Sequence, residues 1–264
     1  MSDDVLLHEI FFDVQRGLPR QGPGSDASTR KTLTLCRGLP ARPAILDIGC
    51  GPGMQTVALA SATGGTITAV DTSREYLDEL KARADAADVA SRIAIVAADM
   101  NRLPFAPESF DLIWSEGAAY IMGFDNALAA WRRFLRPGGF LAVSELVWLV
   151  PDPPAEAAAF FAEGYPAMTG TAAVLARLYA SGYTPVGHFT LPDRDWWESY
   201  YTPMQAKLPA LFARYRGNDA ALDVVRMAER EIDIRRRFAD AYGYVFFVGR
   251  KSDADVRGTR ANQA

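Results

Sequence analysis

The chain has 264 residues, of which 49% are hydrophobic and 23% are charged, so it can form a large domain with a substantial apolar core. Its formal net charge of −4 provides no positive field for nucleic acid or an anionic membrane, and we expect neither as a partner. Its two cysteines suggest no disulfide framework, and its acidic N-terminus lacks the pattern of a signal peptide, so we expect a cytoplasmic protein.

The first 40 residues predict two helices joined by a turn-rich segment. Apolar residues at helical spacing indicate a short amphipathic helix over 3–16. A second helix is predicted over 28–38, with Ser28 as its cap and Gly38 as its stop. Between them, residues 20–25 read Arg-Gln-Gly-Pro-Gly-Ser. This segment is either a simple connector or a lid over a ligand.

The stretch 44–55 has the pattern of a strand, a tight glycine turn and a helix start. An apolar run that includes Asp47 is typical of a buried parallel strand. Gly49, Gly51 and Gly53 permit a close approach of the backbone to a ligand at the strand's carboxyl end. The G-x-G-x-G spacing differs from the dinucleotide fingerprint, which disfavours a nicotinamide-dependent dehydrogenase.

Strands and helices then alternate up to residue 147, which predicts a parallel sheet with helices on both faces. The second strand, 66–70, ends at Asp71, about 20 residues beyond the glycines, where an acid would meet a ribose diol. A third strand, 92–96, precedes Asp99. The remaining elements predicted in this region are helices over 54–62, 73–87 and 124–135, started by Ser73 and Asp125, a turn over Arg136–Gly139 and a fifth strand over 140–147.

Beyond residue 150, three prolines interrupt this alternation. The pattern then predicts helices at about 155–163 and 170–181, a sixth strand over 183–191, a mostly helical segment 193–241, a last strand over 242–251 and a polar tail. The segment 193–241 is either an insertion that recognises substrate or a dimer interface.

Five ordered motifs in this chain resemble those of the class I S-adenosylmethionine-dependent methyltransferases. They are ILDIGCGPG at 45–53, AVD at 69–71, AADMNRLPF at 97–105, FDLIWSEGA at 110–118 and FLRPGGFLAVSE at 134–145. The resemblance covers residues 20–150 well, and it is greatest to the small-molecule branch that includes quinone-biosynthesis enzymes.

This resemblance implies an α/β fold with a Rossmann-like, seven-stranded, mostly parallel sheet, helices on both faces and a helical cap insertion. The last strand of the sheet would be antiparallel. The chain would divide into N-terminal helices with a cofactor lid (1–40), a cofactor-binding core (41–150), a substrate or cap region with the last two strands (151–251) and a disordered tail (252–264).

The resemblance also assigns contacts to the cofactor, S-adenosyl-L-methionine. Asp71 would accept hydrogen bonds from the ribose hydroxyls, Asp99 would accept one from the adenine amino group, and the Met100 backbone N–H would donate to a ring nitrogen. Asp47 would either reach the ammonium group or brace the glycine loop. Further contacts are expected from Gln21, Gly49, Cys50, Gly51, Gln55, Thr72 and Ser115.

Methyl transfer to a hydroxyl, an activated carbon or a protonated amine requires a base, and we expect it among Glu116, His188 and Tyr120. Glu116 could receive a proton, attract an amine or pair with a neighbouring cation. His188 is either a well-placed imidazole or a structural histidine. Tyr120 could line an aromatic pocket or belong to the core, as could Tyr165, Trp197 and Tyr201.

Two further features of the sequence bear on the substrate and on the need for a metal. The Asn-Pro-Pro-Tyr type of motif found in nucleic-acid N-methyltransferases is absent after the fourth strand, and no closely spaced set of His, Cys or Asp indicates a metal. We interpret Arg235–Arg237 as a solvated helix face. The sequence therefore predicts methyl transfer to a small molecule, with S-adenosyl-L-homocysteine as product. The alternatives are a non-catalytic protein that binds either compound and, for the assembly, a homodimer or a monomer.

Overall fold

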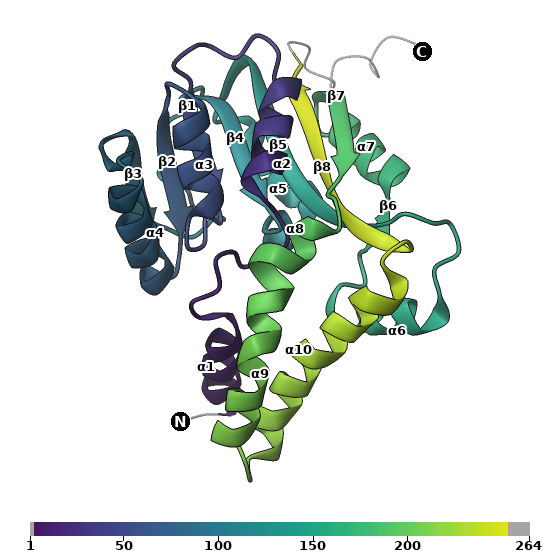
Figure 1. The fold of residues 1–264 in the computed structure, drawn as a ribbon. Helices are drawn as coiled ribbons and strands as arrows, with labels where there is room; N and C mark the ends of the chain where they lie inside the picture. The colour runs from purple at the N-terminus through teal and green to yellow at the C-terminus, as the bar shows by residue number, and fades with distance from the viewer. Residues whose placement is uncertain (1–2, 253–264) are drawn as a thin grey trace.

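The computed structural model describes residues 3–252, which form one eight-stranded sheet covered by helices (Figure 1). The strands are β1 (Ala44–Ile48), β2 (Thr66–Asp71), β3 (Ile93–Ala97), β4 (Phe110–Glu116), β5 (Leu135–Trp148), β6 (Thr169–Gly170), β7 (Tyr183–Thr190) and β8 (Tyr242–Lys251). Their order is β3-β2-β1-β4-β5-β8-β7, with β6 beside β5. Only β8 runs antiparallel to its neighbours among these pairings, as the sequence predicts for the last strand.

The longer helices are α1 (Asp3–Gln15), α2 (Asp26–Leu35), α3 (Met54–Ala62), α4 (Arg74–Ala86), α5 (Phe124–Arg132), α6 (Ala155–Gly164), α7 (Thr171–Ala180), α9 (Thr202–Arg214) and α10 (Asp219–Phe238). The short ones are η1 (Ala90–Arg92), η2 (Ala119–Met122), α8 (Arg194–Trp196) and the π-helical η3 (Trp197–Tyr201). Within residues 3–252, none of the helices combines the length and apolar character needed to cross a bilayer.

Apolar residues on the two faces of the sheet explain its layers. One face packs against α5 and α7, and the other packs against α2, α3 and α4. Ile45, Leu46 and Ile48 of β1 are fully buried, because successive side chains of this central strand point to opposite, covered faces. The strand order reverses between β1 and β4, and a ligand site is expected at such a switch point.

A third apolar cluster forms the helical cap. It joins α1, α6, η3, α9 and α10 to the start of β8, and these helices lie beyond one end of the sheet (Figure 1). Because Tyr242 at the start of β8 pairs with Trp148 at the end of β5, this is the end at which the parallel strands terminate. The cap therefore covers the carboxyl edge of the sheet, where the glycine loop lies.

Several predicted helix boundaries need correction. α2 is capped by Ser25, whose Oγ accepts from the Ser28 N–H, and it ends at Leu35. Ser28 is not the cap, because it lies in the first turn and its hydroxyl donates to Asp195. Asp125 is not a cap either: α5 begins after Gly123, and the Asp125 carboxylate pairs with Arg177.

The predicted turn over Arg136–Gly139 and one prediction about charge are also wrong, and one short strand escaped prediction. The segment Arg136–Gly139 belongs to β5, which begins at Leu135 and shifts its register against β4 there. The two-residue β6 was not predicted. Arg235 is not solvated: it is buried, pairs with Asp193 at 2.8 Å and lies over the ring of Trp196. The predicted tail 252–264 lies outside the described residues except for its first residue.

Candidate functional site

A cavity of about 300 Å³ lies where the carboxyl ends of β2, β1 and β4 meet the N-terminal segment. Its walls come from the glycine loop, from the turns after β2, β3 and β4, and from residues of α1 and of the segment before α2. The predicted residues that line it are Gln21, Gly49, Cys50, Gln55, Asp71, Thr72, Asp99, Met100, Glu116 and Tyr120. The fold thus brings together residues that are up to 99 positions apart, between Gln21 and Tyr120.

The glycine loop forms the floor of this cavity. Gly49 has φ +71°, and a Cβ there would lie 2.6 Å from the Ala118 Cβ, so only glycine fits. The Gly51 N–H donates to Asp71 Oδ2 at 2.9 Å, and the Gln55 amide donates to the Cys50 carbonyl at 2.8 Å. These bonds fix the loop against the end of β2.

Asp71 and Asp47 are held differently. Asp71 accepts from the Gly51 and Ser73 N–H groups, both at 2.9 Å, and a carboxylate retains further acceptor capacity toward the cavity. Asp47 is fully buried behind the loop, where its Oδ2 accepts from Thr56 at 2.6 Å and its Oδ1 has no partner. Burial raises the pKa of Asp47 to about 7. Asp47 therefore braces β1 against α3.

The turn after β3 presents a second carboxylate to the cavity. Asp99 Oδ1 accepts from the backbone N–H and the side-chain amide of Asn101, at 2.9 and 2.8 Å. These bonds lower the pKa of Asp99, so it is ionised at neutral pH. The Met100 side chain lies beside Gly49. Both residues line the cavity, and the contact to a purine that the resemblance assigns to them stays a prediction.

Four of the predicted residues do not line the cavity: Asp47 and Gly51, which belong to the first strand and the glycine loop, and Ser115 and His188. Ser115 is buried, and its Oγ donates to the Ile48 carbonyl at 3.0 Å, which joins β4 to β1. His188 is exposed on β7, which β5 and β8 separate from β4, and its ring stacks on Phe247. The fold therefore does not bring His188 to the cavity, because its strand lies at the far edge of the sheet.

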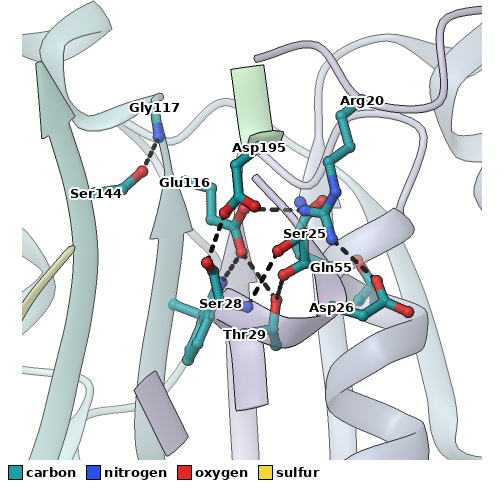
Figure 2. A network of polar contacts seen from close by, with 12 residues as sticks. Arg20, Ser25, Asp26, Ser28, Thr29, Gln55, Glu116, Gly117, Ser144 and Asp195 are labelled. Atoms are coloured by element: carbon teal, nitrogen blue, oxygen red, sulfur yellow. Dashed lines mark hydrogen bonds and ion pairs between the residues drawn. The ribbon is translucent and has the colours of Figure 1, made fainter. Parts of the chain in front are cut away.

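The segment 20–25 folds over the cavity, and Figure 2 shows the polar contacts that hold it there. Arg20 is buried, and it donates to Glu116 Oε2 at 3.0 Å and to Asp26 Oδ1 at 3.2 Å. The Gly24 N–H donates to the Asp195 carbonyl at 3.0 Å. A Cβ on Gly24 would lie 2.8 Å from the Glu116 carboxylate, so glycine lets the segment approach this closely.

Glu116 is fully engaged at the end of β4. Besides Arg20, it accepts from Trp114 Nε1 at 2.9 Å and from the Thr29 hydroxyl at 3.5 Å. Burial raises the pKa of Glu116, and the Arg20 charge opposes that shift. The sequence left three roles open for Glu116. These contacts show one of them, the ion pair with the neighbouring cation Arg20 (Figure 2).

The aromatic residues considered in the sequence separate into two groups. Tyr120 lines the cavity, and its ring lies 5.6 Å from that of Tyr165, which donates to Glu145 at 2.7 Å. Trp197 and Tyr201 lie in the cap instead, where they donate to Asp193 and Glu231.

Several lining residues escaped the sequence-based prediction: Phe11, Phe12, Gln15, Arg20, Tyr76 and Tyr244. For Arg20 a signal existed, because it opens the turn-rich segment that the sequence already marked as a candidate lid. The others follow ordinary helical or strand periodicity, so no local pattern distinguishes them from core residues.

Comparisons with known proteins agree with this geometry. A family model described as "Methyltransferase domain" matches residues 45–139. The 27-O-demethylrifamycin SV methyltransferase of Amycolatopsis mediterranei is 30% identical over 259 residues, covering 94% of this chain and 90% of that protein. The malonyl-[acyl-carrier protein] O-methyltransferase of Enterobacter lignolyticus is 35% identical over 134 residues, covering 50% of this chain and 51% of that protein.

Solved structures are similar in fold over most of the chain. A S-adenosylmethionine-dependent methyltransferase from Geobacter sulfurreducens, in complex with S-adenosyl-L-homocysteine, has a TM-score of 0.76 and 21% identity, covering 91% of this chain and 97% of that one. The [4+2]-cyclase SpnF has a TM-score of 0.71 and 20% identity, covering 94% of this chain and 93% of that one.

Proposed function

Because this chain belongs to the class I S-adenosylmethionine-dependent methyltransferases, we propose that the cavity at the ends of β2, β1 and β4 holds the cofactor and that the acceptor atom is a hydroxyl oxygen. The protein transfers a methyl group to a small molecule and forms S-adenosyl-L-homocysteine as product. The observation that carries the site assignment is that the glycine loop, Asp71 and Asp99 share one cavity.

The charges around the cavity fit this cofactor. Asp71, Asp99 and Glu116 line it, and a sulfonium and an ammonium are cations that such an environment favours. Among the described lining residues, Arg20 is the only Lys or Arg, and its Nε is buried without a hydrogen-bond partner. A carboxylate at the methionine end of the cofactor would satisfy that donor.

Each lining residue then has a proposed partner on the cofactor. Asp71 would take the ribose diol, and Asp99 with the Met100 N–H would take the adenine. The methionine end would lie on the glycine loop, with Gln55 holding that loop in place. The remaining contacts would come from Gln21, Gly49, Cys50, Gly51 and Thr72, whereas Asp47 and Ser115 would support the loop from behind.

The roles of the residues in the reaction follow from their positions. When bound, the cofactor supplies a methyl group attached to a sulfonium: an in-line displacement breaks the bond from the methyl carbon to sulfur and forms the bond to the acceptor oxygen, whose proton passes to solvent. The segment 20–25 covers the cavity and would exclude water from it. The Tyr120 hydroxyl would orient the acceptor, since it lines the same cavity and burial raises its pKa, which keeps it protonated. Glu116 would hold Arg20 in position.

Oxygen as the acceptor atom is supported by the names of the relatives. Besides the two proteins above, the O-methyltransferases resE of Aspergillus sclerotiorum and cnsE of Penicillium expansum are each 31% identical over 58% and 59% of this chain. The similar solved structures do not bear on the acceptor atom, because at this level of identity they show only the fold.

Other predictions stay proposals. We propose the division into a lid region (1–40), a cofactor core (41–150) and a substrate region (151–251), and a cytoplasmic location. A homodimer through α9 and α10 has weaker support, because the apolar residues that suggested it are mostly buried within the chain itself. These are Leu208, Leu211, Val225 and Ile232.

Calorimetric titration with S-adenosyl-L-methionine, S-adenosyl-L-homocysteine and NADH tests the site first. We expect binding of the first two and none of NADH. A panel of hydroxylated aromatic and aliphatic compounds, with the matching amines and thiols, then tests the acceptor atom through formation of S-adenosyl-L-homocysteine. Turnover with amines alone would contradict the oxygen assignment, and the absence of cofactor binding would contradict the site.

A further inference from the structure

A second cavity, of about 430 Å³, lies in the cap between α1, α9 and α10. Most of its wall is apolar: Phe11, Val14, Met204, Ala220, Val224, Met227 and Ala228. Three lining residues are polar, namely Gln15, Asp223 and Glu231. Asp223 is exposed and paired with Arg226. The presence of Gln15 and Glu231 in this mostly apolar wall therefore needs an explanation.

The second cavity adjoins the first across a single ridge. Phe11 and Gln15, one helical turn apart on α1, line both cavities. Phe12 faces only the cofactor cavity, and Val14 faces only the second one. A molecule in the second cavity would therefore lie directly beside whatever occupies the first.

The second cavity is polar at the end that adjoins this ridge. Gln15 is only 6% exposed, and its Oε1 has no hydrogen-bond partner. Its side chain lies near the Tyr200 hydroxyl, and Glu231 lies near that hydroxyl as well. Tyr201 donates to Glu231 Oε1 at 2.8 Å.

A π-helical turn builds this polar end. Tyr200 and Tyr201 are consecutive residues of η3, their rings lie 4.8 Å apart, and the Tyr201 hydroxyl donates to Glu231. Turns of this kind are rare and are frequent at functional sites. Burial raises the pKa of Tyr120 and of Tyr244, which both line the cofactor cavity.

A buried acceptor atom without a partner is costly unless a ligand supplies a donor. Gln15 Oε1 is such an atom, and it stands at the boundary between an apolar chamber and the cofactor cavity. A ligand that fits must therefore have a carbon skeleton for the chamber and one hydrogen-bond donor at its end.

Resting on the function proposed above, we propose that the second cavity binds the methyl acceptor, and that this acceptor is an apolar molecule whose hydroxyl group lies at the ridge near Gln15 and Glu231. The skeleton fills the chamber lined by Val14, Met204, Val224 and Met227. The reacting oxygen then faces the cofactor cavity, and the size of the chamber selects the skeleton.

Two probe series test this on the whole chain in the presence of saturating S-adenosyl-L-homocysteine. The first comprises 4-ethyl-, 4-butyl- and 4-hexylphenol, and calorimetry should show affinity rising by up to about fourfold for each added methylene. The second replaces the hydroxyl by a methoxy group or by hydrogen, and we expect weaker binding of both. The 4-alkylbenzylamines test an amine head group instead.

Three variants and one control variant locate the binding. Met227→Trp should fill the chamber and remove the dependence on chain length, whereas Tyr179→Trp, at an exposed position of α7 outside the described cavities, should keep it. Gln15→Leu and Glu231→Gln should reduce the preference for the phenol over its methoxy analogue. Met227 and Tyr179 are both exposed, so neither tryptophan should impair folding.

The outcomes separate this proposal from the one on which it rests. If S-adenosyl-L-homocysteine binds but the alkylphenols show no dependence on chain length, or if both tryptophan variants behave alike, the acceptor site is overturned and the cofactor site stands. Tighter binding of the amines than of the phenols would overturn the hydroxyl assignment. Failure of S-adenosyl-L-homocysteine itself to bind would overturn the proposed function.

Discussion

The carboxylates around the cofactor cavity differ in what each is free to bind. Asp47 is buried behind the glycine loop and bonded to Thr56, so it supports the loop. Glu116 is committed to Arg20 and Trp114. Asp71 also holds backbone N–H groups, but it lines the cavity and keeps acceptor capacity. At the scale of single residues, Asp71 and the Asp99 carboxylate are therefore the acids on which cofactor affinity should depend most.

Replacing Asp71 by alanine should weaken binding of S-adenosyl-L-homocysteine by about 1.5–3 kcal/mol, the usual contribution of hydrogen bonds to a charged group. Calorimetry measures the change. Asp78→Ala, at an exposed position of α4, serves as the control and should bind like the original chain. Equal affinity of the Asp71 variant and this control would rule out the ribose contact.

Glu145 should make the stability of the fold depend on pH. Burial raises its pKa to about 7, whereas a carboxyl of the unfolded chain titrates near its ordinary value of 4.5. Between these values the folded chain holds a proton that the unfolded chain has lost, so this group lowers stability as pH rises through that window. Glutamine cannot lose that proton, and its Oε1 can still accept from Tyr165.

Glu145→Gln should therefore gain stability relative to the original chain between pH 5 and pH 8, by up to about 3 kcal/mol. Urea unfolding at both pH values measures this gain. The control is Glu156→Gln: Glu156 is exposed, and hydrogen bonds from Arg237 lower its pKa, so it is ionised throughout this range. The control should show the same difference in unfolding free energy from the original chain at both pH values. A Glu145 variant whose difference is also the same at both pH values would contradict the prediction.

At the scale of elements, the sequence predicted the helices and strands whose signals are local patterns of residues. Helix α3 was predicted with the observed bounds, and strand β1 was placed within the stretch 44–55, because the apolar run and the glycines are local signals. The cap of α2 was predicted wrongly, since Ser25 and Ser28 are both suitable residues and only the bond from Ser28 to Asp195, 167 positions away, distinguishes them. The contacts of Arg20 escaped prediction for the same reason: its partner Glu116 is 96 positions away.

The start of α3 offers a test of the glycine loop as an element. Gly53 has φ +84°, and a Cβ there would lie 2.1 Å from Leu80 Cδ1. Gly217 has φ +86° with open space around it. Gly217→Ala should cost about 1–2 kcal/mol, the strain of a left-handed backbone alone. Gly53→Ala should cost distinctly more, because the clash with α4 adds to that strain.

Urea unfolding of the two alanine variants separates the backbone strain from the clash. The Gly53 variant should also bind S-adenosyl-L-homocysteine less well, because the glycine loop must shift to relieve the contact. If both variants lose the same stability, Leu80 moves aside freely and the packing of α3 on α4 does not fix the loop.

At the scale of the whole molecule, three parts meet over the cofactor cavity. The segment 20–25 binds the sheet through Arg20 and Glu116, and it binds the cap through Gly24, whose N–H donates to the Asp195 carbonyl. Ser28 adds a hydrogen bond to the buried Asp195 carboxylate (Figure 2). Because these contacts hold the segment 20–25 at the wall of the cavity, we propose that the release of S-adenosyl-L-homocysteine requires that they break.

A double-mutant cycle on Arg20→Gln and Glu116→Gln should reveal this closure in the dissociation rate of S-adenosyl-L-homocysteine, measured by stopped flow. Each single variant removes one charge of this buried pair and should speed release. The double variant should speed it by less than the two effects combined, with a coupling of about 0.5–3 kcal/mol. The exposed pair Arg16–Glu75 is the control and should give a coupling below about 1 kcal/mol.

A variant of the contact to the cap distinguishes closure from a direct bond between Arg20 and the cofactor. Ser28 is not among the lining residues, so Ser28→Ala can speed release only by loosening the segment from Asp195. Faster release from this variant means that sheet, cap and N-terminal segment close the cavity together. If Ser28→Ala leaves the rate unchanged while Arg20→Gln raises it, Arg20 acts as a ligand to the cofactor, and the contact to the cap does not control release.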